Sequence, residues 1–187
     1  MKTSKTKLRG HLLERRRQLT PAYRVSASAR IVEQVLQQKV LSEHPSIGLY
    51  WPTNSEVDIR PLMDSLRSRG TVICFPRVRQ EGDDVHMDFF AVETVDELKK
   101  GFKGIFEPVG IADITLPSLL IVPGVGFGRN RTRLGYGGGT YDRYLASRKH
   151  PPFLIGVGFD ETLESEVPSE AHDWRMNLII TEAEVLS

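Results

Sequence analysis

The sequence predicts an α/β fold in which a mostly parallel sheet is covered by helices on both faces. Short apolar runs alternate with helix-length segments along the chain, as in consecutive βαβ units. Hydrophobic residues make up 40% and charged residues 26%, which are values typical of globular proteins. With 187 residues, we expect one domain, spanning 1–187, that is large enough to bury a substantial core.

Four segments have the spacing or the boundaries of helices. Residues 4–19 are basic and end just before Pro21, and their apolar side chains recur near helical spacing at Leu8, Leu12, Leu13 and Leu19. We expect this segment to pack as a helix on the α/β core. Further helices are predicted at 26–39, 60–69 and 141–148.

Six apolar runs predict the strands, with bounds at 46–51, 71–75, 87–92, 119–122, 153–159 and 177–181. The polar segment 80–84 is predicted to be a surface turn that joins the second strand to the third. In folds of this class, ligands bind at the carboxyl ends of the parallel strands.

Composition excludes several classes of function. A net charge of +1 gives no strong field toward nucleic acid or a membrane, and no apolar stretch has the length of a membrane span. The basic N-terminal stretch lacks the apolar segment of a secretory signal. Cys74 is the single cysteine, so no internal disulfide forms, and its apolar run predicts a buried hydrophobe. We therefore expect a cytoplasmic protein with neither a nucleic-acid nor a membrane partner.

Residues 121–145 carry the strongest functional signal. After an apolar run, a loop with Arg129, Arg131 and Arg133 leads to four glycines in five positions and then to Asp142. Glycine backbone allows close approach to a ligand, a helix start favours anions, and arginines supply bidentate donors. An acid at the end of such a loop suits magnesium beside phosphates, so the loop favours a nucleoside triphosphate site.

An alternative for this loop is a strand-to-helix turn whose glycines serve only tight packing. The loop contains neither G-x-x-x-x-G-K-[ST] nor G-x-G-x-x-G. Both interpretations remain open at this level. The scattered histidines and the lack of a G-x-S-x-G motif point away from zinc chemistry and from a serine nucleophile.

Four further residues have a functional and a structural interpretation each. Lys5 and Arg9 are four residues apart, so they share a helix face and can reach an anion together, or they form a solvated face. Glu56 follows a predicted strand and can orient a substrate amine or the donor edge of a pterin-like ring, or it is a helix-entry acid. Asp173 can share a metal with Asp142, or it is an exposed loop carboxylate.

Trp51 and Tyr141 supply flat walls for a ring-shaped ligand, or they belong to the core.

Several short motifs occur together along nearly the whole chain. They are K-x-x-L-R at 5–9, R-x-x-L-T at 16–20, Tyr50 followed by Glu56, Glu107-Pro108 after Gly101 and Gly104, V-P-G-x-x-F at 122–127, and R-L-G-x-G-G-G-x-Y-D-R at 133–143, with Asp173 near the end. Together they resemble the 5-formyltetrahydrofolate cyclo-ligase family. The central glycine motif is specific to this family, whereas the other pieces are weak alone.

The resemblance implies a three-layer α/β/α sandwich with a mostly parallel, Rossmann-like sheet. It also implies a reaction in which ATP and magnesium close 5-formyltetrahydrofolate to 5,10-methenyltetrahydrofolate, releasing ADP and phosphate through a phosphorylated imidate. The expected partners are ATP and the folate, with or without a polyglutamate tail. We expect a monomer.

The resemblance also assigns roles to residues of this chain. The ATP-binding residues would be Lys5, Arg9, Arg133, Leu134, Gly135, Tyr136, Gly137, Gly138, Gly139, Thr140 and Tyr141. The folate would be bound by Trp51, Glu56, Tyr136, Gly137, Gly138, Gly139 and Thr140. Magnesium would be held by Asp142 and Asp173, and the catalytic residues would be Arg133, Tyr141 and Asp142.

Two positions depart from the family pattern. Thr140 stands where an aromatic residue is usual, which weakens the expected stacking on the folate. Gly128, followed by the basic run RNRTR, stands where an aspartate is usual, which predicts a loop that is more mobile or more basic toward ATP. These departures keep open a non-catalytic folate or nucleotide binder that acts as a reservoir or regulator. A nucleic-acid-binding protein that uses residues 2–17 is a third, weaker alternative.

Overall fold

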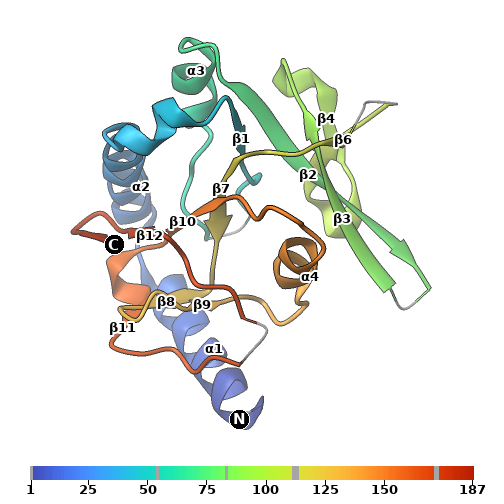
Figure 1. Cartoon of the computed structure of the whole chain (residues 1–187). Helices are drawn as coiled ribbons and strands as arrows, with labels where there is room; N and C mark the ends of the chain where they lie inside the picture. Colours follow the sequence, from blue (N-terminus) through green and yellow to red (C-terminus); the bar gives the residue numbers. More distant parts are fainter. Residues whose placement is uncertain (1, 54, 83, 111–113, 171–172) are drawn as a thin grey trace.

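The fold is built on an eight-stranded sheet (Figure 1). The computed structural model describes residues 2–53, 55–82, 84–110, 114–170 and 173–187. The strand order is β13-β12-β10-β7-β1-β2-β3-β6. The bounds are β1 Ser46–Gly48, β2 Val72–Glu81, β3 Asp84–Ala91, β6 Ile114–Thr115, β7 Leu119–Pro123, β10 Phe153–Val157, β12 Leu178–Ile180 and β13 Val185–Leu186.

The centre of the sheet is parallel and its edges are antiparallel. Strand β1 pairs in parallel with both β2 and β7, and β10 pairs in parallel with both β7 and β12. The pairings β12–β13, β2–β3 and β3–β6 are antiparallel. The predicted mostly parallel sheet is therefore confirmed. All six predicted strands are present, although β2 extends to Glu81, well beyond its predicted end at residue 75.

Helices cover both faces of the sheet. Helices α2 (Pro21–Leu36) and α3 (Leu62–Arg67) lie on one side, and α4 (Thr140–Ala146) lies on the other (Figure 1). Helix α2 begins five residues before its predicted start because Thr20 caps it: its side chain accepts a bond from the Tyr23 N–H at 3.2 Å. Short 3-10 turns span Lys39–Glu43, Val95–Glu97, Phe102–Gly104 and Asp160–Thr162.

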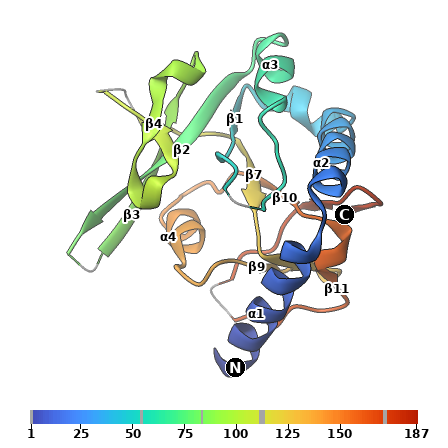
Figure 2. The same cartoon turned by 180° about the vertical axis from the view of Figure 1, so that it is seen from behind.

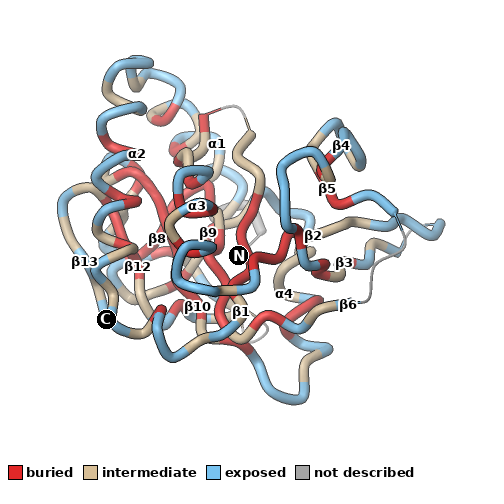
Figure 3. Tube along the Cα trace, turned by 90° about the horizontal axis from the view of Figure 1, so that it is seen from above, coloured by how far each residue is buried: buried red, intermediate tan, exposed pale blue. Residues whose placement is uncertain are grey.

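Alternating side chains of the strands divide the core between the two faces. Ile73 and Phe75 of β2 pack with α2 and α3, whereas Cys74 between them packs with Tyr144 and Leu145 of α4. Side chains of a strand point to opposite faces in turn, so a sheet buried on both faces needs an unbroken apolar run. The buried residues accordingly follow the central strands (Figure 3).

Helix α1 (Lys2–Gln18) packs on a separate three-stranded sheet below the main one (Figure 2). This sheet has the order β11-β8-β9, with β8 at Gly126–Gly128, β9 at Arg133–Leu134 and β11 at Leu163–Glu164. Leu12 of α1 is fully buried there with Val125, Leu134 and Val167. The arginine-containing segment between β7 and the glycine loop, which the sequence predicted to be a loop, therefore contains the β8–β9 hairpin.

The hairpin of β2 and β3 is longer than predicted. Its pairing runs from Cys74 opposite Ala91 to Glu81 opposite Asp84, so part of the predicted turn at 80–84 belongs to the strands. The outer part of the hairpin is polar and exposed, which is why apolar runs did not mark it. Residue 83 lies outside the described residues.

The Cys74 thiol is predicted to resist modification in the folded protein. The side chain is fully buried, and burial raises the pKa of the thiol to about 12. At pH 8 only about one thiol in ten thousand would be ionised and reactive. We expect an aromatic disulfide reagent to label the protein only in denaturant. Rapid labelling without denaturant would contradict this burial.

No helix within the described ranges combines the length and the apolar character that a membrane span requires.

Candidate active site

A large cavity of about 970 Å³ opens where α1, the glycine loop and the β4–β5 hairpin face the carboxyl ends of β1 and β7. Strands β4 and β5 span Leu98–Lys100 and Phe106–Pro108. Every residue that the sequence analysis assigned to ATP, folate, metal or catalysis lines this cavity: Lys5, Arg9, Trp51, Glu56, Arg133, Leu134, Gly135, Tyr136, Gly137, Gly138, Gly139, Thr140, Tyr141, Asp142 and Asp173. The volume is at the upper end of the range for small-molecule sites.

The lining of the cavity has two chemical characters. Most charged side chains come from α1, the glycine loop and the start of α4, together with Glu170 and Asp173. Apolar side chains come from the segment after β1, from β2 and β3, and from residues 102–106, which lead into β5. They are Trp51, Val78, Met87, Phe102, Ile105 and Phe106. One cavity therefore combines a region that carries both positive and negative side chains with an apolar, aromatic region.

Helix α1 holds the glycine loop. The Arg9 guanidinium donates from Nε to the Gly135 carbonyl oxygen at 2.8 Å. Gly137 and Gly139 have φ values of 98° and 63°, which side chains rarely tolerate. A Cβ at Gly137 would also lie 3.4 Å from the Arg9 guanidinium carbon. These glycines are required for the loop's path beneath the arginine.

Lys5 brings the segment near the C-terminus to the same site. Its Nζ donates to Asp173 Oδ2 at 2.5 Å and lies 3.4 Å from Glu170 Oε2. The side chains of Lys5 and Asp173 are each only 15% exposed. The interpretation of Lys5 and Arg9 as a solvated helix face is therefore wrong, and so is that of Asp173 as an exposed loop acid.

Arg133 is the buried cation of the glycine loop. Its side chain is 8% exposed, and its guanidinium lies 3.2 Å from Asp142 Oδ2 and 3.4 Å from the Pro123 carbonyl oxygen. The guanidinium carbon also lies 5.3 Å from the centre of the Tyr141 ring. Burial raises the pKa of the Tyr141 phenol, so this side chain is neutral at physiological pH.

The other two arginines of the loop do not line the cavity. Arg129 pairs with Glu184 near the end of the chain. Arg131 occupies the turn between β8 and β9 with φ of 63°, where its N–H donates to the Gly128 carbonyl oxygen. Only Arg133 of the three contributes to the cavity, which corrects the expectation of a broadly basic phosphate loop.

Gly128 is explained by packing. It lies buried in β8, and a Cβ there would be 2.7 Å from the Val167 nitrogen and 2.8 Å from Thr132 Oγ1. An aspartate has no room at this position. Thr140, the other departure, lies at the first position of α4 and lines the cavity.

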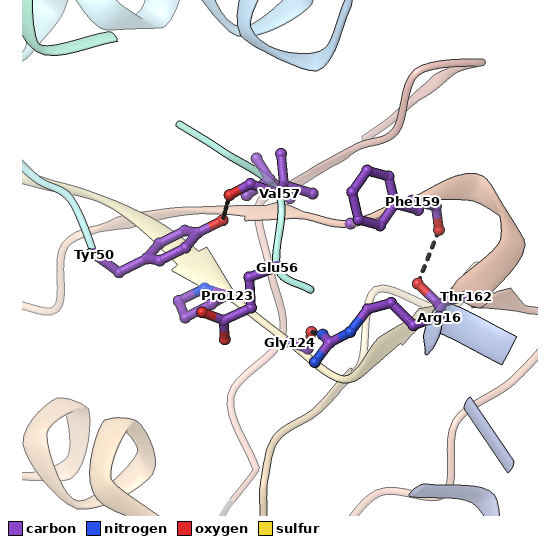
Figure 4. Close-up of a pocket in the computed structure, with 10 residues that line it drawn as sticks. Arg16, Tyr50, Glu56, Val57, Pro123, Gly124, Phe159 and Thr162 are labelled. Atoms are coloured by element: carbon purple, nitrogen blue, oxygen red, sulfur yellow. Dashed lines mark hydrogen bonds between the residues drawn. The ribbon is translucent and has the colours of Figure 1, made fainter. Parts of the chain in front are cut away.

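Both carboxylate oxygens of Glu56 accept hydrogen bonds. Oε2 accepts bonds from the N–H and the hydroxyl of Thr53, at 2.8 and 3.0 Å, and Oε1 accepts from the Tyr136 hydroxyl at 2.7 Å. Nearby, the Tyr50 hydroxyl donates to the Val57 carbonyl oxygen and fixes the turn that carries Glu56 (Figure 4). Glu56 thus has a defined position in the cavity wall.

A second, much smaller cavity lies between Glu56 and Arg16 (Figure 4). Its volume of about 10 Å³ has room for roughly one water molecule, so no substrate fits there.

Trp51 packs against the core and also lines the large cavity. Its ring packs against Phe106 and Phe75, with centroids 5.1 and 6.2 Å apart, and it also lines the large cavity. The indole is therefore an aromatic wall that the core holds in place.

Two sets of residues at or beside the site received no role in the sequence analysis. One is Arg16, which contacts the Tyr136 hydroxyl. The other is the segment from Phe102 to Phe106, held by Glu107, whose Oε1 accepts from the Val78 N–H at 3.2 Å. Burial raises the pKa of the Glu107 carboxyl. The pair Glu107-Pro108 was visible as a motif, but no role was assigned to it.

The model of the 5-formyltetrahydrofolate cyclo-ligase family matches residues 1–182. The chain belongs to this family. It is 24% identical to the mouse 5-formyltetrahydrofolate cyclo-ligase, over 96% of this chain and 94% of the mouse protein. It is 27% identical to the enzyme of the same name from Mycolicibacterium smegmatis, over 95% of this chain and 93% of the relative.

Solved structures of the family share the fold. The 5,10-methenyltetrahydrofolate synthetase of Aquifex aeolicus superposes with a TM-score of 0.84 at 26% identity, covering 97% of this chain and 91% of that one. The synthetase of Mycoplasma pneumoniae gives a TM-score of 0.76 at 21% identity, covering 95% of this chain and 98% of that one, which supports the fold alone.

Proposed function

We propose that the protein uses ATP to close 5-formyltetrahydrofolate to 5,10-methenyltetrahydrofolate, with release of ADP and phosphate. The observation that best supports this proposal is that every residue with an assigned role lines one cavity, in a chain that belongs to the cyclo-ligase family. The charged and the aromatic linings suit a triphosphate and a flat folate, respectively.

The chemistry requires activation of a poor leaving group. The oxygen of the formyl group on N5 attacks the γ-phosphorus of ATP. A new O–P bond forms, and the bond between the γ-phosphorus and the departing oxygen of ADP breaks. Nitrogen 10 then attacks the formyl carbon of the phosphorylated imidate, and inorganic phosphate leaves with the former formyl oxygen. N10 loses its proton, and the new C–N bond closes the ring.

The protein's task is to hold two ligands in line and to balance charge. Lys5, Arg9 and Arg133 would contact the phosphates, and the glycine loop would let the nucleotide approach its backbone. Glu56 would accept N–H donors of the pterin ring, with Trp51 as a wall. Tyr141, a neutral phenol beside Arg133, would border the junction of the two ligands.

The two carboxylates assigned to magnesium fit that metal. Asp142 and Asp173 line the same cavity, and magnesium commonly binds one or two carboxylates together with substrate phosphates and water. Among the described residues, no group of three or more His, Cys, Asp and Glu side chains could hold a metal. When bound, magnesium would neutralise charge on the phosphate oxygens. Arg133 and Lys5 now contact these two carboxylates, and each cation would shift toward phosphate when MgATP binds.

Spectroscopy tests the proposed reaction directly. Purified protein is mixed with 5-formyltetrahydrofolate and MgATP, and the near-ultraviolet absorbance of the methenyl product is followed. An absorbance increase that depends on ATP would support the proposal. A flat trace with folate binding retained in calorimetry would make the protein a non-catalytic folate binder, and Thr140 would be the first position to restore to an aromatic residue.

Replacing Arg9 with alanine is expected to raise the KM for ATP about tenfold while kcat changes little. A hydrogen bond to a charged group contributes about 1.5–3 kcal/mol, and phosphate is contacted in the ground state as well as the transition state. Steady-state kinetics over a range of ATP concentrations measures this. Arg17→Ala is the matched control, because Arg17 lies on the same helix with its side chain 70% exposed. An unchanged KM for ATP in Arg9→Ala would contradict the proposed phosphate contact and would leave Arg9 with the hydrogen bond to Gly135 alone.

A further inference from the structure

One face of α1 contacts the glycine loop near one end and the turn that carries Glu56 near the other. Residues 5, 9, 12 and 16 are spaced by four, three and four, so they lie on the same side of the helix. Along this face, Lys5 contacts Asp173, Arg9 contacts Gly135, Leu12 is buried on the β8–β9 hairpin, and Arg16 contacts the turn that carries Glu56. The helix therefore connects the glycine loop to the Glu56 region.

Arg16 is unusual among the basic residues of α1 because it is buried. Only 4% of the residue is exposed, and each guanidinium nitrogen donates a hydrogen bond. Nε bonds to Ser55 Oγ at 2.9 Å, Nη1 to the Gly124 carbonyl oxygen at 3.1 Å, and Nη2 to the Tyr136 hydroxyl at 2.6 Å. A buried guanidinium with three fixed partners forms a rigid junction between three loops.

The hydrogen bonds around Tyr136 have a fixed direction. A guanidinium has donors only, so the Tyr136 hydroxyl must accept from Arg16 and is left to donate its proton to Glu56 Oε1, 2.7 Å away. Half of the Tyr136 residue is exposed, but loss of solvent around its phenol and the nearby Glu56 charge both raise the pKa of that phenol, so the proton stays on the hydroxyl at physiological pH. Arg16 thereby determines which way the hydroxyl points.

We infer that Arg16 is a positioning residue for folate: it orients the Tyr136 hydroxyl, which in turn fixes the Glu56 carboxylate against the pterin ring. This inference rests on the proposed function, in which Glu56 accepts the pterin N–H groups. Arg16 also donates to the hydroxyl of Ser55, the residue before Glu56, so it holds the turn that carries the carboxylate as well. It acts on the folate region, although it belongs to the same helix face as the residues assigned to ATP.

A double-mutant cycle tests the inference. Arg16→Gln, Tyr136→Phe and the double variant are compared by calorimetry with 5-formyltetrahydrofolate and with MgATP. We expect Tyr136→Phe to weaken folate binding about fivefold and Arg16→Gln to weaken it at least tenfold, at the usual strength of such hydrogen bonds. In the Tyr136→Phe background, Arg16→Gln should add less than its full effect, because both act through one hydroxyl. The MgATP affinity of the Arg16→Gln variant should stay within about twofold, because Arg16 does not line the large cavity.

Two further variants keep the test decisive. Arg15→Gln removes the neighbouring arginine, which pairs with Glu164 and does not line the cavity, and it should leave folate affinity unchanged. If Arg16→Gln fails to fold, Arg16→Lys preserves the buried charge but not the three-way geometry, and it carries the same expectation.

Three results would overturn the inference. Equal weakening of folate and MgATP with a lowered Tm would indicate a merely structural role, and fully additive effects in the cycle would separate Arg16 from Tyr136. Unchanged folate affinity in Arg16→Gln, with normal turnover by the wild-type protein, would overturn this inference and leave the proposed function intact. Absence of folate binding by the wild-type protein would overturn both.

Discussion

Arg133→Ala is expected to lower kcat about a thousandfold or more while the protein stays folded. In the proposed reaction, negative charge spreads over the transferred phosphoryl group, and an arginine that stabilises this charge can contribute three or more orders of magnitude. Arg133 suits this role because its side chain is 8% exposed in the cavity wall, where a charge acts through little water. Single-turnover kinetics at saturating MgATP separates this loss from weaker binding.

Arg129→Ala is the matched control for this experiment. Arg129 comes from the same loop, but its guanidinium pairs with Glu184 rather than lining the cavity, so kcat should be unchanged. Arg133→Lys should also be strongly impaired, because lysine retains the charge but not the fork that reaches both Asp142 and Pro123. Near-normal turnover by Arg133→Ala, or equal impairment by Arg129→Ala, would contradict the catalytic assignment.

The strands that the sequence predicted are those whose burial requires consecutive apolar residues. Strand β7 is buried at Leu119 to Val122 because helices cover both faces of the sheet, and the apolar run records this directly. The missed strands are two or three residues long and are held by backbone pairing. In β4, Leu98–Lys100, only the leucine is buried, so no periodicity could indicate it.

The site was predictable where the backbone itself constrains the residue type. Gly137 and Gly139 adopt positive φ, so their place in the motif reflects a local requirement that the sequence displays. Arg16 lies within three consecutive arginines, and successive helical residues point about 100° apart. Arg15 reaches Glu164, Arg17 lies beside Glu14, and Arg16 turns inward, a difference that only the tertiary structure creates.

Asp142→Asn is expected to lower kcat about a hundredfold or more, and to change how magnesium affects ATP binding. Asparagine keeps the shape of the side chain but removes the charge that is proposed to hold the metal. The fold should persist, because α4 is anchored by the buried Tyr144 and Leu145 rather than by Asp142, whose side chain is 22% exposed. Circular dichroism and thermal unfolding check the fold.

Calorimetry with ATP, with and without magnesium, gives a readout that a damaged fold would not mimic. In the wild-type protein, Asp142 holds Arg133 and repels phosphate, so ATP alone should bind weakly and magnesium should strengthen binding. In Asp142→Asn, ATP alone should bind more tightly, because Arg133 loses its competing carboxylate, whereas magnesium should give less gain. Asp88→Asn is the matched control, since Asp88 is a similarly buried carboxylate paired with Arg79 and does not line the cavity. Tighter binding of ATP alone and a smaller gain from magnesium both follow from removing the one negative charge beside Arg133. If magnesium strengthened ATP binding in Asp142→Asn as much as in the wild-type protein, the assignment of Asp142 as a metal ligand would be contradicted.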